Sequence, residues 1–142
     1  MRGSSMRSDG RWLGRVDEMA SVLTIEDNPA NMKLAIFLLE RTGHEVLQAT
    51  NAEDGIRLAS ERRPELILMD VQLPGMDGLA ATRILKADAH TRAIKIVALT
   101  ALAMSGDKER IEAAGCDGYI TKPFRYQDFL KVVEELLAVT LT

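Results

Sequence analysis

Short apolar runs alternate with longer amphipathic stretches along most of this chain. The runs have the length of β-strands, and apolar residues at helical spacing follow each of them. Five runs predict strands, at Ser21–Ile25, Glu45–Ala49, Leu66–Asp70, Lys95–Thr100 and Gly118–Thr121. The third run is almost continuously apolar, which is typical of a strand covered on both faces.

The segments between these runs carry start and stop signals for helices. Asn28 and Pro29 predict a helix start, because Asn caps helices and Pro is favoured at the first helical position. Gly43 ends that helix as a C-terminal glycine. Further helices are expected at about Ala52 to Arg62, at about Asp77 to Ala87 and at Ser105–Ala114. A last helix is indicated by an apolar stripe that we expect to be buried, made of Tyr126, Phe129, Val133, Leu136 and Leu137.

Five strand–helix units joined by short links predict an α/β fold. Such units form a parallel sheet with right-handed crossovers and with helices on both faces. We therefore expect a doubly wound, flavodoxin-like, five-stranded parallel sheet of order 2-1-3-4-5. In that order the direction of winding reverses between the first and third strands, and ligands bind at this point.

Composition narrows the class of protein. The chain has 142 residues, of which 46% are hydrophobic and 27% charged, as in an ordinary globular domain. A net charge of −3 provides no basic stripe for nucleic acid. No apolar run is long enough to span a bilayer, so we expect no membrane insertion. The single cysteine, Cys116, excludes an internal disulfide and favours a reducing compartment, so we expect a cytoplasmic protein.

Residues 1–18 differ from the rest of the chain. They are rich in Arg, Gly and Ser and have no hydrophobic period. We expect a disordered tag or leader there, with the folded domain in residues 19–142.

Polar side chains stand at the ends of four predicted strands. Glu26 and Asp27 follow the first strand, Asp70 ends the third, Thr100 ends the fourth and Lys122 follows the fifth. The carboxyl ends of parallel strands meet in one crevice, so these groups are expected to converge. Clustered acids oppose each other's ionisation unless a cation lies among them, and hard oxygen ligands favour Mg²⁺.

We expect Asp27 and Asp70 to bind the metal directly, with Glu26 acting through water and the backbone carbonyl of Gln72 as a further ligand. Each residue also has an ordinary interpretation. The acids after the first strand could only favour the start of a helix, and Asp70, Thr100 and Lys122 could be solvated strand ends. The complete ordered set, rather than any one member, favours a metal-assisted aspartyl phosphorylation site.

Residues 21–138 resemble the response-regulator receiver domains of two-component signalling. The resemblance rests on four stretches, Ile25–Asn28, Leu66–Gly78, Ala98–Ala101 and Gly115–Pro123. With no output region following, the chain is most similar to stand-alone receivers of the CheY or DivK kind. The stretch Glu26–Leu34 favours the DivK group.

The resemblance implies a role for each matching residue. Asp70 is implied as the phosphoacceptor, Glu26 and Asp27 as the acid pair that binds metal, Thr100 and Tyr119 as switch residues, and Lys122 as the phosphoryl-binding lysine. The Lys122–Pro123 bond is implied to be cis, which X–Pro bonds permit at modest cost. Gln72 and Leu102 are expected to tune dephosphorylation. Lys95 departs from the family pattern, in which proline is common ahead of the fourth strand.

The implied function is that of a single-domain response regulator in a phosphorelay. It would accept a phosphoryl group from a sensor histidine kinase or a histidine phosphotransfer protein, with Mg²⁺, and change the surface of its fourth helix, fifth strand and fifth helix, roughly Ser105–Leu137. That surface would control a downstream protein target. Such a chain catalyses only its own modification and is not an enzyme in the usual sense. Its oligomeric state is left open.

Two other classes were weighed against this interpretation. Phosphatases of the haloacid dehalogenase type also use an aspartyl phosphate, but they need an acid two residues after the nucleophile, where this chain has Gln72. An interaction module independent of phosphorylation is disfavoured, because such modules usually lack part of the set. A dinucleotide-binding role is excluded, since no Gly-x-Gly-x-x-Gly turn follows the first strand.

Overall fold

The computed structural model describes residues 20–101 and 106–141. The expected tag or leader, residues 1–18, lies outside the described residues, as does Leu102. In the described part, no helix is both long and apolar enough to cross a membrane.

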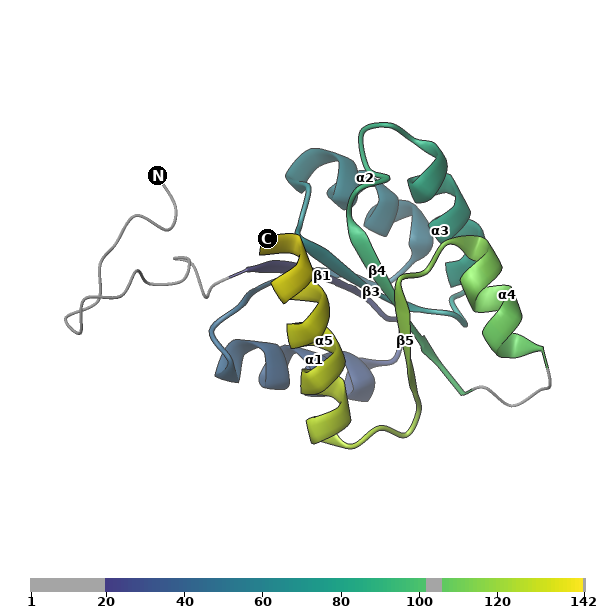
Figure 1. The fold of residues 1–142 in the computed structure, drawn as a ribbon. Coiled ribbons are helices and arrows are strands. Elements are labelled where there is room, and N and C mark those ends of the chain that lie inside the picture. Colours follow the sequence, from purple (N-terminus) through teal and green to yellow (C-terminus); the bar gives the residue numbers. More distant parts are fainter. Residues whose placement is uncertain (1–19, 102–105, 142) are drawn as a thin grey trace.

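Five parallel strands form a single twisted sheet (Figure 1). They are β1 (Ser21–Ile25), β2 (Glu45–Ala49), β3 (Leu66–Asp70), β4 (Lys95–Thr100) and β5 (Gly118–Thr121). Their order across the sheet is β2-β1-β3-β4-β5, which confirms the predicted flavodoxin-like arrangement. Because β1 pairs with both β2 and β3, the winding reverses beside β1, where a crevice opens at the carboxyl ends of the strands.

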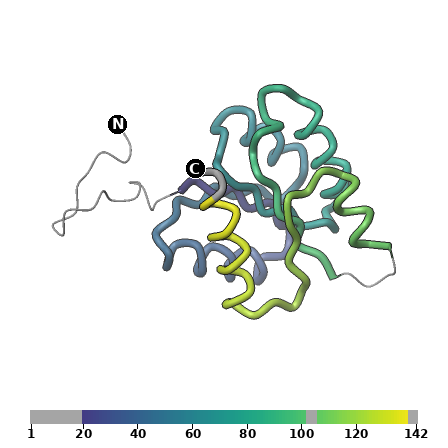
Figure 2. The backbone as a smooth tube through the Cα atoms, viewed as in Figure 1, coloured from purple at the N-terminus to yellow at the C-terminus, as the bar shows by residue number. Residues whose placement is uncertain are grey.

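Helices cover both faces of the sheet, as the tube drawing also shows (Figure 2). They are α1 (Pro29–Arg41), α2 (Ala52–Arg62), α3 (Gly78–Ala87), α4 (Asp107–Ala114) and α5 (Tyr126–Leu141). Side chains at i and i+2 of a strand point to the same face, so alternate strand residues form separate cores. The core shared with α1 and α5 contains Val22, Leu68, Val97 and Phe129, whereas the core shared with α2 and α3 contains Leu23, Ile67 and Ile96.

The predicted caps explain where two of the helices begin. Asn28 caps α1, accepting a hydrogen bond from the Asn31 backbone N–H at 3.0 Å, and Pro29 follows as the first helical residue. Asp77 caps α3 in the same way, through the Ala80 N–H at 2.8 Å. Asn28 thus starts α1 directly after the polar end of β1, and Asp77 starts α3 directly after the loop that follows β3. Both caps hold the loops of the crevice in place.

Two sequence expectations differ from the structure. Tyr126 was expected in the buried stripe of α5, but its side chain is 57% exposed. It is the first residue of α5, and the packed stripe begins one turn later at Phe129, which is fully buried and stacks on Phe124. The helix expected from Ser105 has its described start at Asp107.

Candidate phosphoryl-acceptor site

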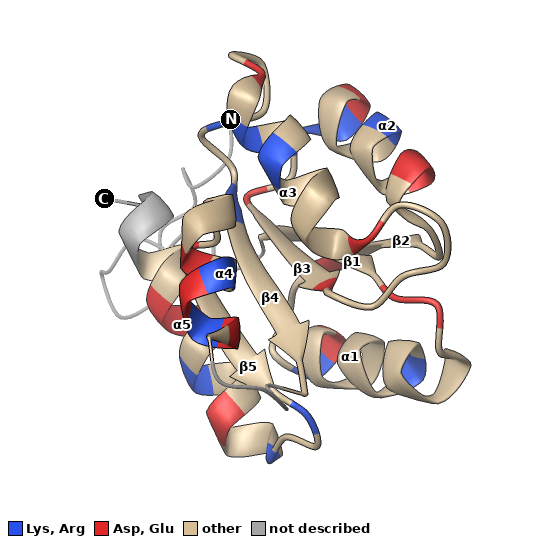
Figure 3. Ribbon diagram, turned by 90° about the vertical axis from the view of Figure 1, so that its right-hand side faces the viewer, with Lys and Arg blue, Asp and Glu red and all other residues tan. Residues whose placement is uncertain are grey.

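Acidic residues lie at the carboxyl ends of two neighbouring strands, β1 and β3, and are red on the ribbon in Figure 3. Glu26 and Asp27 directly follow β1, and Asp70 is the last residue of β3. Because β1 and β3 are hydrogen-bonded neighbours, with Ile25 opposite Met69, the strand ends bring the three carboxyl groups together. One oxygen from each lies within 4.8 Å of the others.

Burial distinguishes the members of this cluster. The exposed fractions of Glu26 and Asp70 are 1% and 4%, whereas Asp27 is exposed to solvent. Burying a carboxylate is costly unless a cation or hydrogen-bond donors compensate its charge. Glu26 and Asp70 therefore require partners.

Lys122 provides the cationic partner. Its ammonium nitrogen lies 3.2 Å from an oxygen of Glu26 and 3.2 Å from an oxygen of Asp70. Lys122 directly follows β5, and its backbone N–H donates to the carbonyl of Thr100 at 2.8 Å. The peptide bond between Lys122 and Pro123 is cis. The lysine thus reaches from the far edge of the sheet, across the end of β4, to the acids.

Backbone N–H groups complete the support of the two buried acids. The Asn28 N–H donates to Glu26 Oε2 at 3.1 Å, and the Gln72 N–H donates to Asp70 Oδ1 at 3.0 Å. Each donor lies two residues beyond the acid that it supports. The loops that follow β1 and β3 therefore orient the carboxylates.

Even with these partners the cluster carries excess negative charge. The pKa of Glu26 is raised from its ordinary 4.5 to about 7, chiefly by burial and to a smaller degree by the hydrogen bond to Asp70 and the charge of Asp70. The Asn28 N–H and the Lys122 ammonium act in the opposite direction. A carboxyl group that resists ionisation beside another acid indicates a place where a bound cation would be stabilising.

The donor set suits a hard divalent cation. Oxygen ligands from Glu26, Asp27 and Asp70 are those that Mg²⁺ prefers, and the exposed side of Asp27 leaves room for the water molecules that Mg²⁺ retains. The backbone N–H of Gln72 donates a hydrogen bond to Asp70 Oδ1, which keeps the Gln72 backbone beside the acids. The residues present therefore fit the expected metal.

A cleft adjoins the acids on the α4 side. Its volume is about 440 Å³, and its lining includes Gln72, Thr100, Asp77, Asp107 and Arg110. Thr100, only 8% exposed, thus lines a cavity next to β3, the strand that ends in Asp70. Sequence reasoning missed Asp107 and Arg110, which form an ion pair; their spacing of three residues on a helix was the available signal.

Tyr119 lies away from this cleft. It is half-buried on β5, packs against the core formed with α4, and lines a separate groove on the outer side of β5. The structure therefore brings Glu26, Asp27, Asp70 and Lys122 into one cluster and Thr100 beside it. Tyr119 occupies a second location.

Gly78 is a site residue that the hydrophobic pattern and the motifs of the sequence do not single out. A β-carbon at this position would lie 2.1 Å from the backbone oxygen of Asp70, far inside van der Waals contact. Only glycine lets α3 begin this close to the end of β3, where the Gly78 N–H donates to the carbonyl of Val71 at 2.9 Å. The signal was a glycine following the α3 cap, Asp77.

Comparison with known proteins identifies the family. The model of the response regulator receiver domain matches residues 22–134. The chain belongs to the response regulator receiver domain family. The polar-differentiation response regulator DivK of Brucella anthropi is 45% identical over 117 residues, covering 82% of this chain and 95% of the relative. DivK of Brucella melitensis is 44% identical over the same shares of both chains.

Solved receiver structures have the same fold. The receiver domain of the sensor histidine kinase PA1611 from Pseudomonas aeruginosa, solved with a magnesium ion coordinated in its active-site cleft, has a TM-score of 0.78 and 34% identity. The match covers 84% of this chain and 98% of that one. The chemotaxis response regulator CheY4 of Vibrio cholerae has a TM-score of 0.77 and 26% identity, covering 83% and 98%. The chain is thus a DivK-like receiver of two-component signalling.

The raised pKa of Glu26 predicts a pH-dependent stability of the metal-free receiver. Between the ordinary value of 4.5 and the folded value of about 7, the folded state binds more protons than the unfolded state. Stability should therefore fall as pH rises through this window, by an amount on the order of 3 kcal/mol at about 1.4 kcal/mol per pKa unit. Glu26→Gln cannot ionise at this position, so its stability should not fall in this way as pH rises. The variant should be more stable than wild type at pH 8 but not at pH 5.

Urea unfolding of both proteins in chelator, at the two pH values, measures the effect. Asp27→Asn is the matched control, because Asp27 is exposed and its replacement should leave the wild-type pH dependence. Identical pH dependence in wild type and Glu26→Gln would contradict the interpretation.

Proposed function

We propose that this receiver is a single-domain response regulator, formed by residues 19–142, that accepts a phosphoryl group on Asp70. The donor is a phosphohistidine of a sensor histidine kinase or of a histidine phosphotransfer protein. The observation that carries the proposal is the position of Asp70, 4% exposed and 3.2 Å from the Lys122 ammonium. Resemblance to DivK proteins over 82% of the chain supports the same function.

The transfer forms one bond and breaks another. A carboxylate oxygen of Asp70 bonds to phosphorus, while the bond between phosphorus and the imidazole nitrogen of the donor breaks and its electrons stay on that nitrogen. Such a transfer needs little covalent chemistry from the protein and depends on alignment and charge stabilisation. The Gln72 N–H orients the carboxylate, and Lys122 neutralises phosphoryl oxygens.

Glu26, Asp27, Asp70 and the backbone carbonyl of Gln72 would hold Mg²⁺. When bound, the ion supplies positive charge that offsets the negative charge of the phosphoryl oxygens. The chain modifies itself once in each signalling cycle and does not turn over an external substrate.

Phosphorylation of Asp70 then changes a surface that lies away from Asp70. The added group carries about two negative charges and draws the Thr100 hydroxyl towards it. Movement of Thr100 opens space into which Tyr119 turns, and the surface of α4, β5 and α5 changes. This biases an existing equilibrium between two conformations rather than creating a new fold, and the changed surface controls a protein target.

Asp70→Asn should abolish phosphoryl transfer, because an amide oxygen is a poor nucleophile. Intact-mass analysis after incubation with acetyl phosphate should show one added phosphoryl group on wild type in Mg²⁺ and none on the variant. Asp77→Asn, which changes an exposed acid in the neighbouring loop, is the control and should still be modified. Undiminished modification of Asp70→Asn would exclude Asp70 as the acceptor.

Thr100→Ala should separate the phosphorylation of Asp70 from the change in the α4–β5–α5 surface that follows it. We expect the variant to gain the phosphoryl group but to show less than half of the wild-type change in hydrogen exchange across residues 118–137. Thr121→Ala provides a control, because Thr121 is an exposed threonine opposite Thr100 on β5. A full wild-type response in phosphorylated Thr100→Ala would show that the hydroxyl is not part of the switch.

A further inference from the structure

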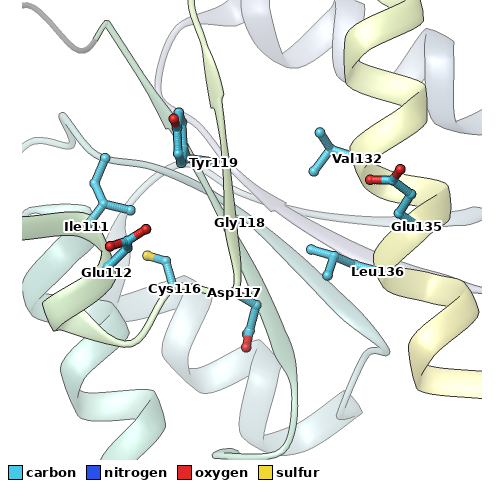
Figure 4. Close-up of a pocket in the computed structure, with 9 residues that line it drawn as sticks. All are labelled: Ile111, Glu112, Cys116, Asp117, Gly118, Tyr119, Val132, Glu135 and Leu136. Carbon is cyan, nitrogen blue, oxygen red and sulfur yellow. The ribbon is translucent and has the colours of Figure 1, made fainter. Parts of the chain in front are cut away.

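A groove runs along the outer edge of β5, between α4 and α5 (Figure 4). Its first part has a volume of about 330 Å³ and is lined by Ile111, Glu112, Cys116, Asp117, Gly118, Tyr119, Val132, Glu135 and Leu136. A second hollow, of about 290 Å³, shares Tyr119 and Val132 with the first and continues along β5 to Arg125. We call the two parts together the β5 groove.

The floor of the β5 groove is an open strand edge. β5 is the last strand of the sheet and pairs with β4, and no other segment in the described part of the chain pairs with its outer side. An edge strand exposes N–H and C=O groups that can pair with a further strand. At about 3.3 Å per residue, β5 can pair with about four residues of an extended segment.

The walls of the β5 groove present two uncompensated carboxylates. Glu112 on α4 and Glu135 on α5 are exposed, and neither has an ion pair or hydrogen bond through its side chain to a residue that the structure describes. They lie on opposite sides of β5 (Figure 4). The third acid, Asp117, differs because Lys86 pairs with it at 2.9 Å.

The two walls belong to opposite faces of the sheet. Tyr119 packs with the α4 core, whereas a β-carbon on its neighbour Gly118 would meet Leu136 and Val132 of α5, at 3.4 and 3.7 Å. Side chains of a strand added beside β5 would alternate in the same way. One residue of that strand would face Glu112 and the next would face Glu135.

We propose that the β5 groove binds its protein partner through a short extended segment that pairs with β5 and carries basic side chains on both of its faces. Apolar residues of the segment cover the half-buried Tyr119 and Val132, and its two basic residues occupy adjacent positions, or positions three apart, so that one reaches each carboxylate. The inference deepens the proposed function by giving the chemistry of the target that the α4–β5–α5 surface controls.

Charge disfavours the other occupants. A second copy that pairs through its own β5, Gly118–Thr121, would bring no basic residue to Glu112 and Glu135 and would add two more carboxylates to the interface. A helical ligand would leave the edge of β5 unpaired and would present its basic residues three or four apart on one stripe.

The test uses the full chain and a labelled, capped heptapeptide of valine and threonine with two adjacent arginines at its centre. Fluorescence anisotropy should show saturable binding, weakened about two- to five-fold by Glu112→Gln and by Glu135→Gln, as expected for exposed ion pairs. Glu109→Gln removes an exposed acid of α4 that does not line the groove, and should bind like wild type. Moving the arginines two positions apart puts both on one face, and should weaken binding several-fold.

Main-chain pairing is tested separately. Methylation of alternate peptide nitrogens should abolish binding for the set whose N–H groups face β5 and should leave it unchanged for the other set. Equal binding by both methylated peptides, or tighter binding by a peptide with arginines four apart, would overturn strand pairing. Self-association that is strengthened by Glu112→Gln or Glu135→Gln would place a second copy on the β5 groove and also overturn the proposal.

These measurements are independent of phosphoryl transfer. Binding to the unphosphorylated chain reports on the β5 groove alone, and intact mass on the same samples reports on Asp70. A chain that is phosphorylated but ignores the peptide refutes the inference and leaves the proposed function in place. A chain that binds the peptide but is never phosphorylated refutes the proposed function and leaves strand pairing at the β5 groove in place.

Discussion

The crowding of carboxylates around one ammonium group is the constraint on which this receiver site depends. Lys122 lies 3.2 Å from both Glu26 and Asp70, and removal of that charge would leave two buried acids opposed to each other. Breaking a buried charged network by removing one partner is strongly destabilising. One cation does not balance three carboxyl groups, and burial together with the hydrogen bond to Asp70 raises the pKa of Glu26. The site therefore favours further positive charge, which the proposed phosphoryl transfer to Asp70 requires.

The sheet order is what makes this crowding possible. Glu26 and Asp70 are far apart in sequence but follow neighbouring strands, and Lys122 arrives from the edge strand β5, two strands from β3. The same strand carries Tyr119 towards α4 and forms the floor of the β5 groove. Strand β5 thus joins the acidic cluster at its carboxyl end to the surface beside α4 and α5.

Much of this arrangement could be predicted from the sequence, because strand-ending residues in a parallel α/β fold converge whatever the details of packing. The five strands and their order followed from hydrophobic periodicity, and the converging acids followed from that order. Tyr126 was misplaced because periodicity identifies a helix face without showing where that face leaves the core. Gly78, Asp107 and Arg110 were missed for a different reason. The spacing of Asp107 and Arg110 indicates their ion pair, but the place of that pair in the cleft with Thr100 depends on tertiary packing, as does the close approach of α3 to β3 at Gly78.

The central claim is that Asp70, supported by Lys122 and a bound cation, is the residue that carries the phosphoryl group. Borohydride reduction of the phosphorylated chain, followed by peptide mapping, tests it most directly, because reduction converts an aspartyl phosphate to homoserine and marks its position. The account predicts homoserine at position 70 alone, formed when Mg²⁺ is present and absent when the metal is chelated. Homoserine at another acid, or at position 70 regardless of metal, would contradict it.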